Sequence, residues 1–327
     1  MPSGVSCVGM DSMDLEVLKS ILEWQAQGVS VLLATLVKTW GSAPRPVGSL
    51  LALTRDGRLV GSLSGGCIED DLLELVRTHT HSLPERMSYG ISADQASRFG
   101  LPCGGELELV LEPLHAGSGI GQLLQSVMAR DVVGRELDLA SGLVRITPAR
   151  PTDRLEYDTH RLRSIHGPRW RLLIIGAGQV SRYLAEMAQA LDYNVQVCDP
   201  RREFRDSWPG HLPGIDPGMP DDFILEQAPD PHTAIVALTH DPKQDDLALL
   251  EALKSSAFYV GAIGSKSNQS KRRERLALFD LTPEQIAALH GPAGLPIGSR
   301  TPPEMAVSIL AELTAVRHRI RLLPVPE

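Results

Sequence analysis

The stretch RLLIIGAGQVSRYLAEMAQALDYNVQVCDPR, residues 171–201, decides the fold of the C-terminal half of this chain. Residues 172–175 form an apolar run of strand length, and the turn from Gly176 to Gly178 follows directly. Apolar residues then recur at helical spacing as far as Leu191, and residues 195–198 form a second apolar run. The order of strand, glycine turn, helix and strand predicts a βαβ unit that binds a ligand at its turn.

The residues of this unit have separate expected roles. Gly176 allows a tight turn, and Gly178 lets a pyrophosphate approach the N–H groups at the start of the helix, where Gln179 follows. Asp199 ends the second strand and is placed to accept hydrogen bonds from a ribose. Ser181 stands where the usual fingerprint has a third glycine. The alternative is a turn that is rich in glycine for steric reasons alone.

Two further strands are expected in the C-terminal half, at residues 233–238 and 258–263. Together with the βαβ unit they predict a Rossmann-like, doubly wound parallel sheet, which binds ligands at the carboxyl ends of its strands. The candidate contacts at those ends are His240, Gly264 and Ser265. The basic run Lys271, Arg272 and Arg273 could bind a phosphate, although a run of charges is also typical of a solvated face.

The N-terminal half reads as a smaller α/β domain. A helix is expected at residues 14–27, a buried strand at 29–38, and a hairpin from 49–54 to 59–63 around an Asp-Gly turn. Arg45 lies between two prolines, in a loop that therefore holds a shape. It could pair with a phosphate, with a partner protein, or with an acidic residue of its own domain.

Two of the four cysteines lie beside pairs of glycines. Cys67 follows Gly65 and Gly66 at the expected start of a helix, where the helix dipole favours a thiolate. Cys103 precedes another glycine pair, just before a strand. If the two thiols meet in space, they suit a soft metal centre or sulfur transfer. The alternative for Cys67 is a small residue packed on the sheet. Cys198 is expected to be a buried, structural thiol.

Length and composition limit the class of protein. The chain has 327 residues, is 43% hydrophobic and carries a net charge of −8, so we expect folded domains and no general affinity for nucleic acid. No apolar run is long enough to span a bilayer and no signal peptide is evident, so the cytoplasm is the expected location. We expect an N-terminal domain over residues 1–147, with its core at about 14–115, a connection over 148–168, and a C-terminal domain over 169–327.

Several motifs, in order along the chain, resemble the xanthine dehydrogenase accessory proteins of the XdhC/CoxI type. They are GSAPRPVG (41–48), SGGCIE (64–69), GLPCGGELEL (100–109), LIIGAGQV (173–180), VCDPR (197–201), LTHD (238–241), VGAIGSK (260–266) and PIGSRTPPEMAVSILAEL (296–313). The resemblance implies a chaperone that binds molybdenum cofactor, holds it while a cysteine desulfurase sulfurates it, and delivers it to a molybdenum hydroxylase of the xanthine dehydrogenase type. It also implies a homodimer.

Placed on this chain, the resemblance implies that the glycine turn and Asp199 hold the phosphate or nucleotide of the cofactor. Cys67 and Cys103 would act at its metal end, as molybdenum ligands or as a sulfur relay. The protein would then be an accessory factor more than a turnover enzyme.

Two alternatives remain open at this point. The βαβ unit alone would also suit an NAD(P)-dependent oxidoreductase, because a fold does not decide a function. The N-terminal half, however, has no evident acid and base pair for hydride chemistry. The other alternative is a nucleotide-responsive scaffold that carries no cofactor.

Overall fold

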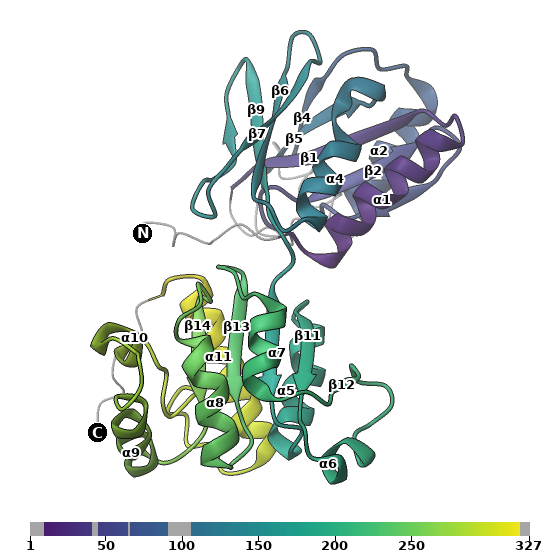
Figure 1. Ribbon diagram of the computed structural model, residues 1–327. Helices are drawn as coiled ribbons and strands as arrows, with labels where there is room; N and C mark the ends of the chain where they lie inside the picture. Colours follow the sequence, from purple (N-terminus) through teal and green to yellow (C-terminus); the bar gives the residue numbers. More distant parts are fainter. Residues whose placement is uncertain (1–9, 41–44, 65, 91–105, 321–327) are drawn as a thin grey trace. The chain divides into compact units, whose positions relative to one another are not determined.

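The computed structural model describes residues 10–40, 45–64, 66–90 and 106–320 (Figure 1). The described residues form two compact units, 10–168 and 169–320. Each unit has its own sheet and its own buried apolar clusters.

The unit from residue 169 onward is the expected Rossmann-like domain. Its sheet has the order β12-β11-β10-β13-β14, and every neighbouring pair of strands is parallel. The strands are β10 (Arg171–Ile175), β11 (Asn194–Cys198), β12 (Ile215–Asp216), β13 (Thr233–Ala237) and β14 (Tyr259–Ala262). The helices are α5 (Gln179–Ala190), α6 (Arg202–Asp206), α7 (Pro220–Gln227), α8 (Pro242–Ala252), α9 (Lys266–Leu276), α10 (Pro283–Ala287) and α11 (Pro302–Arg317).

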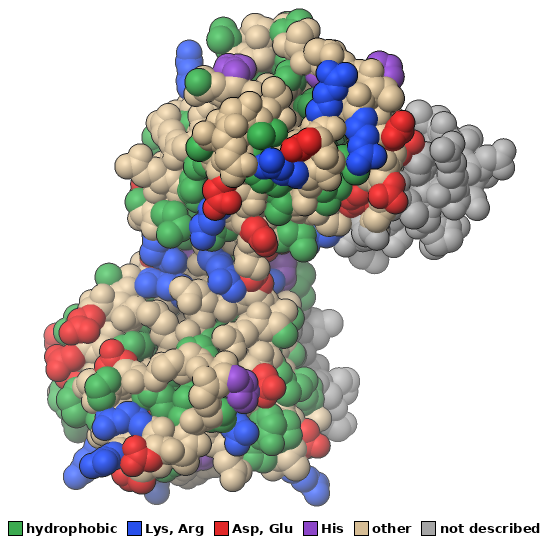
Figure 2. All heavy atoms as spheres, turned by 90° about the vertical axis from the view of Figure 1, so that its right-hand side faces the viewer, with side chains coloured by type: hydrophobic (Ala, Val, Ile, Leu, Met, Phe, Trp, Pro, Cys, Tyr) green, Lys and Arg blue, Asp and Glu red, His purple; other side chains and the backbone are tan. Residues whose placement is uncertain are grey.

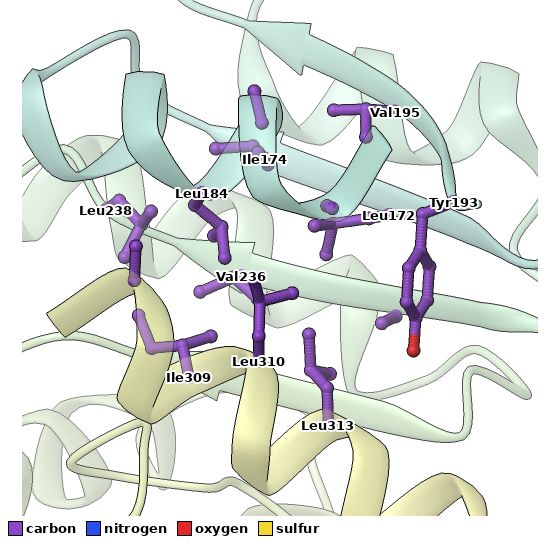
Figure 3. Close-up of a cluster of buried hydrophobic side chains, with 14 of the residues drawn as sticks. Leu172, Ile174, Leu184, Tyr193, Val195, Val236, Leu238, Ile309, Leu310 and Leu313 are labelled. Carbon is purple, nitrogen blue, oxygen red and sulfur yellow. The ribbon is translucent and has the colours of Figure 1, made fainter. Parts of the chain in front are cut away.

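Helices cover both faces of this sheet, which explains why its strands are apolar on both sides. Helices α7 and α8 pack on one face, and α5 and α11 pack on the other (Figure 1). Figure 3 shows the second layer, where Leu184 of α5 and Leu310 of α11 meet Val236 of β13. The expected parallel sheet is confirmed, and the burial of alternate strand residues on opposite faces fixes its layers.

The other unit is built on an antiparallel sheet of the order β3-β2-β1-β5-β4. Its strands are β1 (Val31–Trp40), β2 (Leu50–Thr54), β3 (Leu59–Gly61), β4 (Glu85–Tyr89) and β5 (Glu106–Pro113). Helices α1 (Ser12–Ala26) and α2 (Cys67–Thr78) contribute apolar side chains to the clusters beside it. The expected hairpin forms as β2 and β3, with Leu51 opposite Gly61.

The expected connection at residues 148–168 instead contains two strands of a second sheet. This sheet has the order β7-β6-β9-β8, with β6 (Val133–Asp138), β7 (Val144–Pro148), β8 (Glu156–Tyr157) and β9 (Arg161–His166), and α4 (Ile120–Met128) precedes it. In β9, Leu162 is buried while the arginines on either side of it are more exposed. These arginines hide the strand pattern in the sequence, because a single apolar residue between charges resembles a polar loop.

Charged side chains of both signs occur on each unit over the face that Figure 2 shows. None of the helices in the described part of the chain is both long and apolar enough to span a membrane.

Candidate functional site

The candidate site lies at the carboxyl ends of the parallel strands. The chain runs outward from β10 to β11 and β12, and then returns to β13 on the other side of β10. Doubly wound folds bind their ligands in the crevice at such a reversal, which here falls between the loops that follow β10 and β13. The two loops are in contact: a Cβ added at Gly176 would lie 2.9 Å from the Cα atom of Thr239.

The glycine turn presents backbone donors to this crevice. Gly176 has φ +99°, which together with the approach of Thr239 excludes any side chain there. Gly178 is the N-cap of α5 and provides no side-chain hydrogen bond, and a Cβ at this position would meet no atom within 4 Å. Gln179 follows as an exposed first helical residue. The N–H groups of the first helical turn therefore face open space that an anion can fill.

Asp199 lies where expected, after β11, but its carboxylate is bound by the protein itself. Its side chain is fully buried and accepts hydrogen bonds from the N–H groups of Ala177 (2.8 Å) and Arg201 (3.0 Å). The guanidinium of Arg201 donates two more, at 2.9 and 2.8 Å. Burial opposes the charge, but the hydrogen bonds from Arg201 and Ala177 lower the pKa of Asp199 below its usual value. All four acceptor positions are filled by the protein, so a ribose would have to displace Arg201.

The sequence pattern does not reveal Arg201 as the partner of Asp199. The two residues are only two positions apart, within the VCDPR motif. Their ion pair holds the carboxylate of Asp199, which joins the end of β11 to the glycine turn by accepting the N–H of Ala177. The arginine also lies over the ring of Phe204, 4.0 Å from its centroid. The signal was an acid and an arginine in one short loop.

The loops after β13 and β14 lie next to each other. His240 is exposed and has φ +60°, and Gly264 has φ +138°. Both residues line one cavity of about 220 Å³. Ser265 is the N-cap of α9, where its hydroxyl accepts the N–H of Asn268 at 3.2 Å. The structure thus brings His240 and Gly264 together, and gives the Ser265 hydroxyl a capping role.

Arg45 belongs to the other unit and has a local partner. Its guanidinium lies 2.9 Å from the carboxylate of Asp11. Asp11 in turn caps α1 by accepting the N–H of Asp14 at 2.8 Å. This ion pair ties the proline-rich loop to the start of the first helix, which agrees with the structural role that the sequence left open.

The glycine-flanked cysteines are described only in part. Cys67 is the first residue of α2, directly after Gly66, whose φ of +140° is one that glycine adopts readily. The side chain of Cys67 and the whole of Cys103 lie outside what the structure describes.

Glu69 shapes the loop that leads to Cys67, a role that the sequence alone does not predict. Its buried carboxylate accepts from the hydroxyls of Ser62 and Ser64 and from the N–H groups of Leu63, Ser64 and Gly66. Burial alone would raise the pKa of Glu69, but the hydrogen bonds from Ser64 and Leu63 lower it to about 2. The available signal was an acid at the third helical position, as in a capping box.

Cys198 behaves as the buried thiol that the sequence predicts. Its Sγ donates to the carbonyl of Gly218 at 3.3 Å, and burial together with Asp216 raises the pKa of the thiol to about 12. Such a group is not a nucleophile at neutral pH. Across residues 10–40, 45–64, 66–90 and 106–320, no group of three or more His, Cys, Asp or Glu residues is placed to hold a metal ion.

Comparison with known proteins agrees with these features. The family model of the XdhC Rossmann domain matches residues 172–313, and that of the XdhC and CoxI family matches residues 24–90. The chain is 26% identical, over 314 residues, to the molybdenum cofactor insertion chaperone PaoD of Escherichia coli (strain K12). That alignment covers 92% of this chain and 88% of the relative.

Two further similarities extend over nearly the whole chain. A protein of Bacillus subtilis (strain 168) that is named as a probable xanthine dehydrogenase component is 26% identical over 339 residues, covering 94% of this chain and 98% of that protein. A crystal structure described as a xanthine dehydrogenase from Bacillus halodurans has a TM-score of 0.71 and 25% identity, covering 96% of this chain and 98% of its own. The two family models together match more than half of the chain, and this protein belongs to the XdhC and CoxI family.

Proposed function

We propose that this protein is a maturation factor that binds molybdenum cofactor and delivers it to a molybdenum hydroxylase of the xanthine dehydrogenase type. One observation carries the proposal: the uncapped start of α5, which Gly178 leaves open to an anion, in a chain of this family. The relative from Escherichia coli is named as a molybdenum cofactor insertion chaperone, which supports the same role. The cofactor is the cargo of such a protein.

The glycine turn would hold the phosphate end of the cofactor. The N–H groups at the start of α5 supply donors and the positive end of the helix dipole. Asp199 holds this turn by accepting the N–H of Ala177, and Arg201 holds Asp199. Because the two side chains are paired with each other, they would not contact the cofactor. Gln179, exposed as the first residue of α5, would contact the ligand from the helix side.

Cys67 and Cys103 would act at the metal end, as molybdenum ligands or as a sulfur relay during sulfuration by a cysteine desulfurase. The position of Cys67 at the start of α2 supports this role, because a helix N-terminus favours a thiolate. Replacing either cysteine by serine should therefore abolish cofactor retention or sulfuration and leave the circular dichroism spectrum unchanged. Full retention and full activation of the hydroxylase by both variants would rule out the thiol role.

The alternative of an NAD(P)-dependent oxidoreductase is weakened by Asp199. Dinucleotide-binding enzymes use the acid at this position to recognise the ribose. Here Arg201 and Ala177 occupy both oxygens of that carboxylate. The acid that ends β11 is therefore not free to accept from a ribose hydroxyl.

The decisive experiment is to purify the full chain from cells that make molybdenum cofactor. The sample is oxidised and assayed for pterin fluorescence and for molybdenum, with the same chain from cells that lack the cofactor as the control. We expect both signals, in proportion to protein, only in the first sample. The absence of both, together with NADH oxidation on a small substrate, would favour the oxidoreductase.

A further inference from the structure

A second cavity lies beside the glycine turn, at the carboxyl ends of β13 and β14. It has a volume of about 220 Å³ and is walled by the β13–α8 loop, the β14–α9 loop and one side of α9. From α9 it receives Asn268, Lys271 and Arg275, which recur at helical spacing and therefore share a face. His240 closes it from the β13 side.

The floor of the cavity is a fixed ion pair. Arg272 is only 5% exposed, and its guanidinium lies 2.7 Å from Asp245, whose side chain is completely buried. The same guanidinium also donates to Asp246 at 3.2 Å and to the carbonyl of Ile263 at 3.0 Å. A buried pair with this many hydrogen bonds does not rearrange easily, because breaking it leaves an uncompensated charge. The cavity therefore has a preformed polar floor.

The charges of this cluster do not cancel. Arg272 lies against Asp245 and Asp246, and Arg275 lies against Asp246 at 2.5 Å. Lys271 is exposed on the same wall and has no ion pair or hydrogen bond within the described part of the chain. Three cations thus face two carboxylates, which leaves one positive charge at the cavity mouth.

Thr239 contacts both the glycine turn and a residue that lines the cavity. This residue touches Gly176 on one side, and on the other it donates its N–H (3.1 Å) and its hydroxyl (2.6 Å) to Asp245. The glycine turn and the cavity therefore flank one residue. A ligand that carries two separated anionic groups could contact both at once.

We propose that this cavity is a second anion subsite, with Lys271 as its binding cation, that takes a phosphoryl group of the ligand held at the glycine turn. A tetrahedral phosphoryl group fits its volume and accepts hydrogen bonds from an ammonium and from Asn268. The ligand class is then a cofactor with two anionic groups, such as a form joined to a nucleotide. The identification of that ligand as molybdenum cofactor rests on the function proposed above, whereas the subsite itself does not.

The test uses inorganic phosphate and the full chain free of cofactor. Phosphate is titrated by calorimetry into the wild type, Lys271→Glu and Lys271→Gln, with Lys19→Glu as a control for the change in net charge. Lys19 is an exposed residue of α1, in the other unit. In a Gly178→Asp variant the new carboxylate would occupy the N–H donors of the glycine turn, so that phosphate could bind only in the cavity.

We expect two classes of phosphate site in the wild type. Lys271→Glu should weaken one class roughly tenfold or more, Lys271→Gln should weaken it less, and Lys19→Glu should leave both unchanged. Gly178→Asp should remove only the other class. A single class that Lys271→Glu does not alter would overturn the subsite, as would equal losses in the Lys271→Glu and Lys19→Glu variants. Two classes of site in a protein that never carries pterin would uphold the subsite and contradict the proposed function.

Discussion

Under the proposed function, Gly178 is the residue on which ligand binding at the turn would depend most directly. Its backbone has φ −80° and ψ −174°, an extended conformation that any residue adopts, so its lack of a side chain is not required by the fold. An added Cβ meets no neighbour within 4 Å. The glycine keeps open the space in front of the helix N–H groups, and a side chain there would fill it.

Replacing Gly178 by aspartate should separate folding from binding. Aspartate is a favoured N-cap, so the stability of the variant should equal or exceed that of the wild type by up to about 1 kcal/mol. Its carboxylate would occupy the donors and repel a phosphate, so pterin and molybdenum retained after purification should fall roughly tenfold or more.

Asparagine at the same position is the matched control for Gly178→Asp, because it caps a helix as well as aspartate and carries no charge. We expect it to retain more cofactor than the aspartate variant. Wild-type retention by Gly178→Asp, with unchanged melting temperature, would show that the turn does not hold the cargo.

Asp199 shows how far sequence reasoning reaches at this scale. The spacing from Gly176 correctly predicts an acid at the end of the second strand. Its role could not be read in the same way, because it depends on the direction in which Arg201 points. A motif records positions along the chain, whereas the competition between a ribose and a guanidinium for one carboxylate is decided in space.

The loop that leads into α2 depends on the side chain of Glu69. This carboxylate accepts the N–H groups of Leu63, Ser64 and Gly66. The loop ends at Cys67, so the same carboxylate determines where that residue enters the helix.

Glutamine at position 69 should destabilise the unit formed by residues 10–168. Its amide replaces one acceptor by a donor that faces N–H groups, which should lower the free energy of unfolding by about 2–4 kcal/mol at pH 7. The pKa of Glu69 is depressed in the folded state, so its contribution is complete above the unfolded value near 4.5 and is lost as the pH falls toward about 2. Urea unfolding of both proteins from pH 7 to pH 3 measures this. A difference between them that stays constant over the whole range would contradict the ionised state of Glu69.

Elements that pair with near neighbours in the sequence are easier to predict than elements that pair with distant segments. The β2–β3 hairpin is recognisable because its Asp-Gly turn and both strands lie within a few residues of one another. Strand β9 pairs along its whole length with β6, earlier in the chain, and its local partner β8 has only two residues, so the hairpin pattern in the sequence is weak. The arginines at 161 and 163 also conceal its buried residues, so the sequence predicts a connection where the structure has a strand.

At the scale of the whole molecule, the chain forms two compact units, residues 10–168 and 169–320. Buried clusters around β10 and β13 belong to one unit, and those around β1 and β5 belong to the other. Domains with separate cores can unfold separately. The fold of the second unit was the easier to predict, because a parallel sheet with alternating helices leaves long, regular apolar runs.

Calorimetry of the full chain should resolve two unfolding transitions. Glu69→Gln should lower the midpoint of one by roughly 5–10 °C, and Gly176→Ala should lower the midpoint of the other, because its methyl group would meet the backbone of Thr239. The double variant should show both shifts, each close to its value in the single variant. One transition that both substitutions shift together would mean that the two units unfold as one.

The ion pair of Asp199 and Arg201 also bears on how cargo would leave. Because Asp199, held by Arg201, accepts the N–H of Ala177 and so fixes the glycine turn, binding and release of a cofactor there would change the backbone motion little. In such a protein the binding conformation of the turn would be present before the cofactor binds, and release would bring little gain in conformational entropy. Under the proposed function, transfer would therefore be driven by the higher affinity of the hydroxylase for the cofactor. The empty protein could then bind another cofactor without a conformational change.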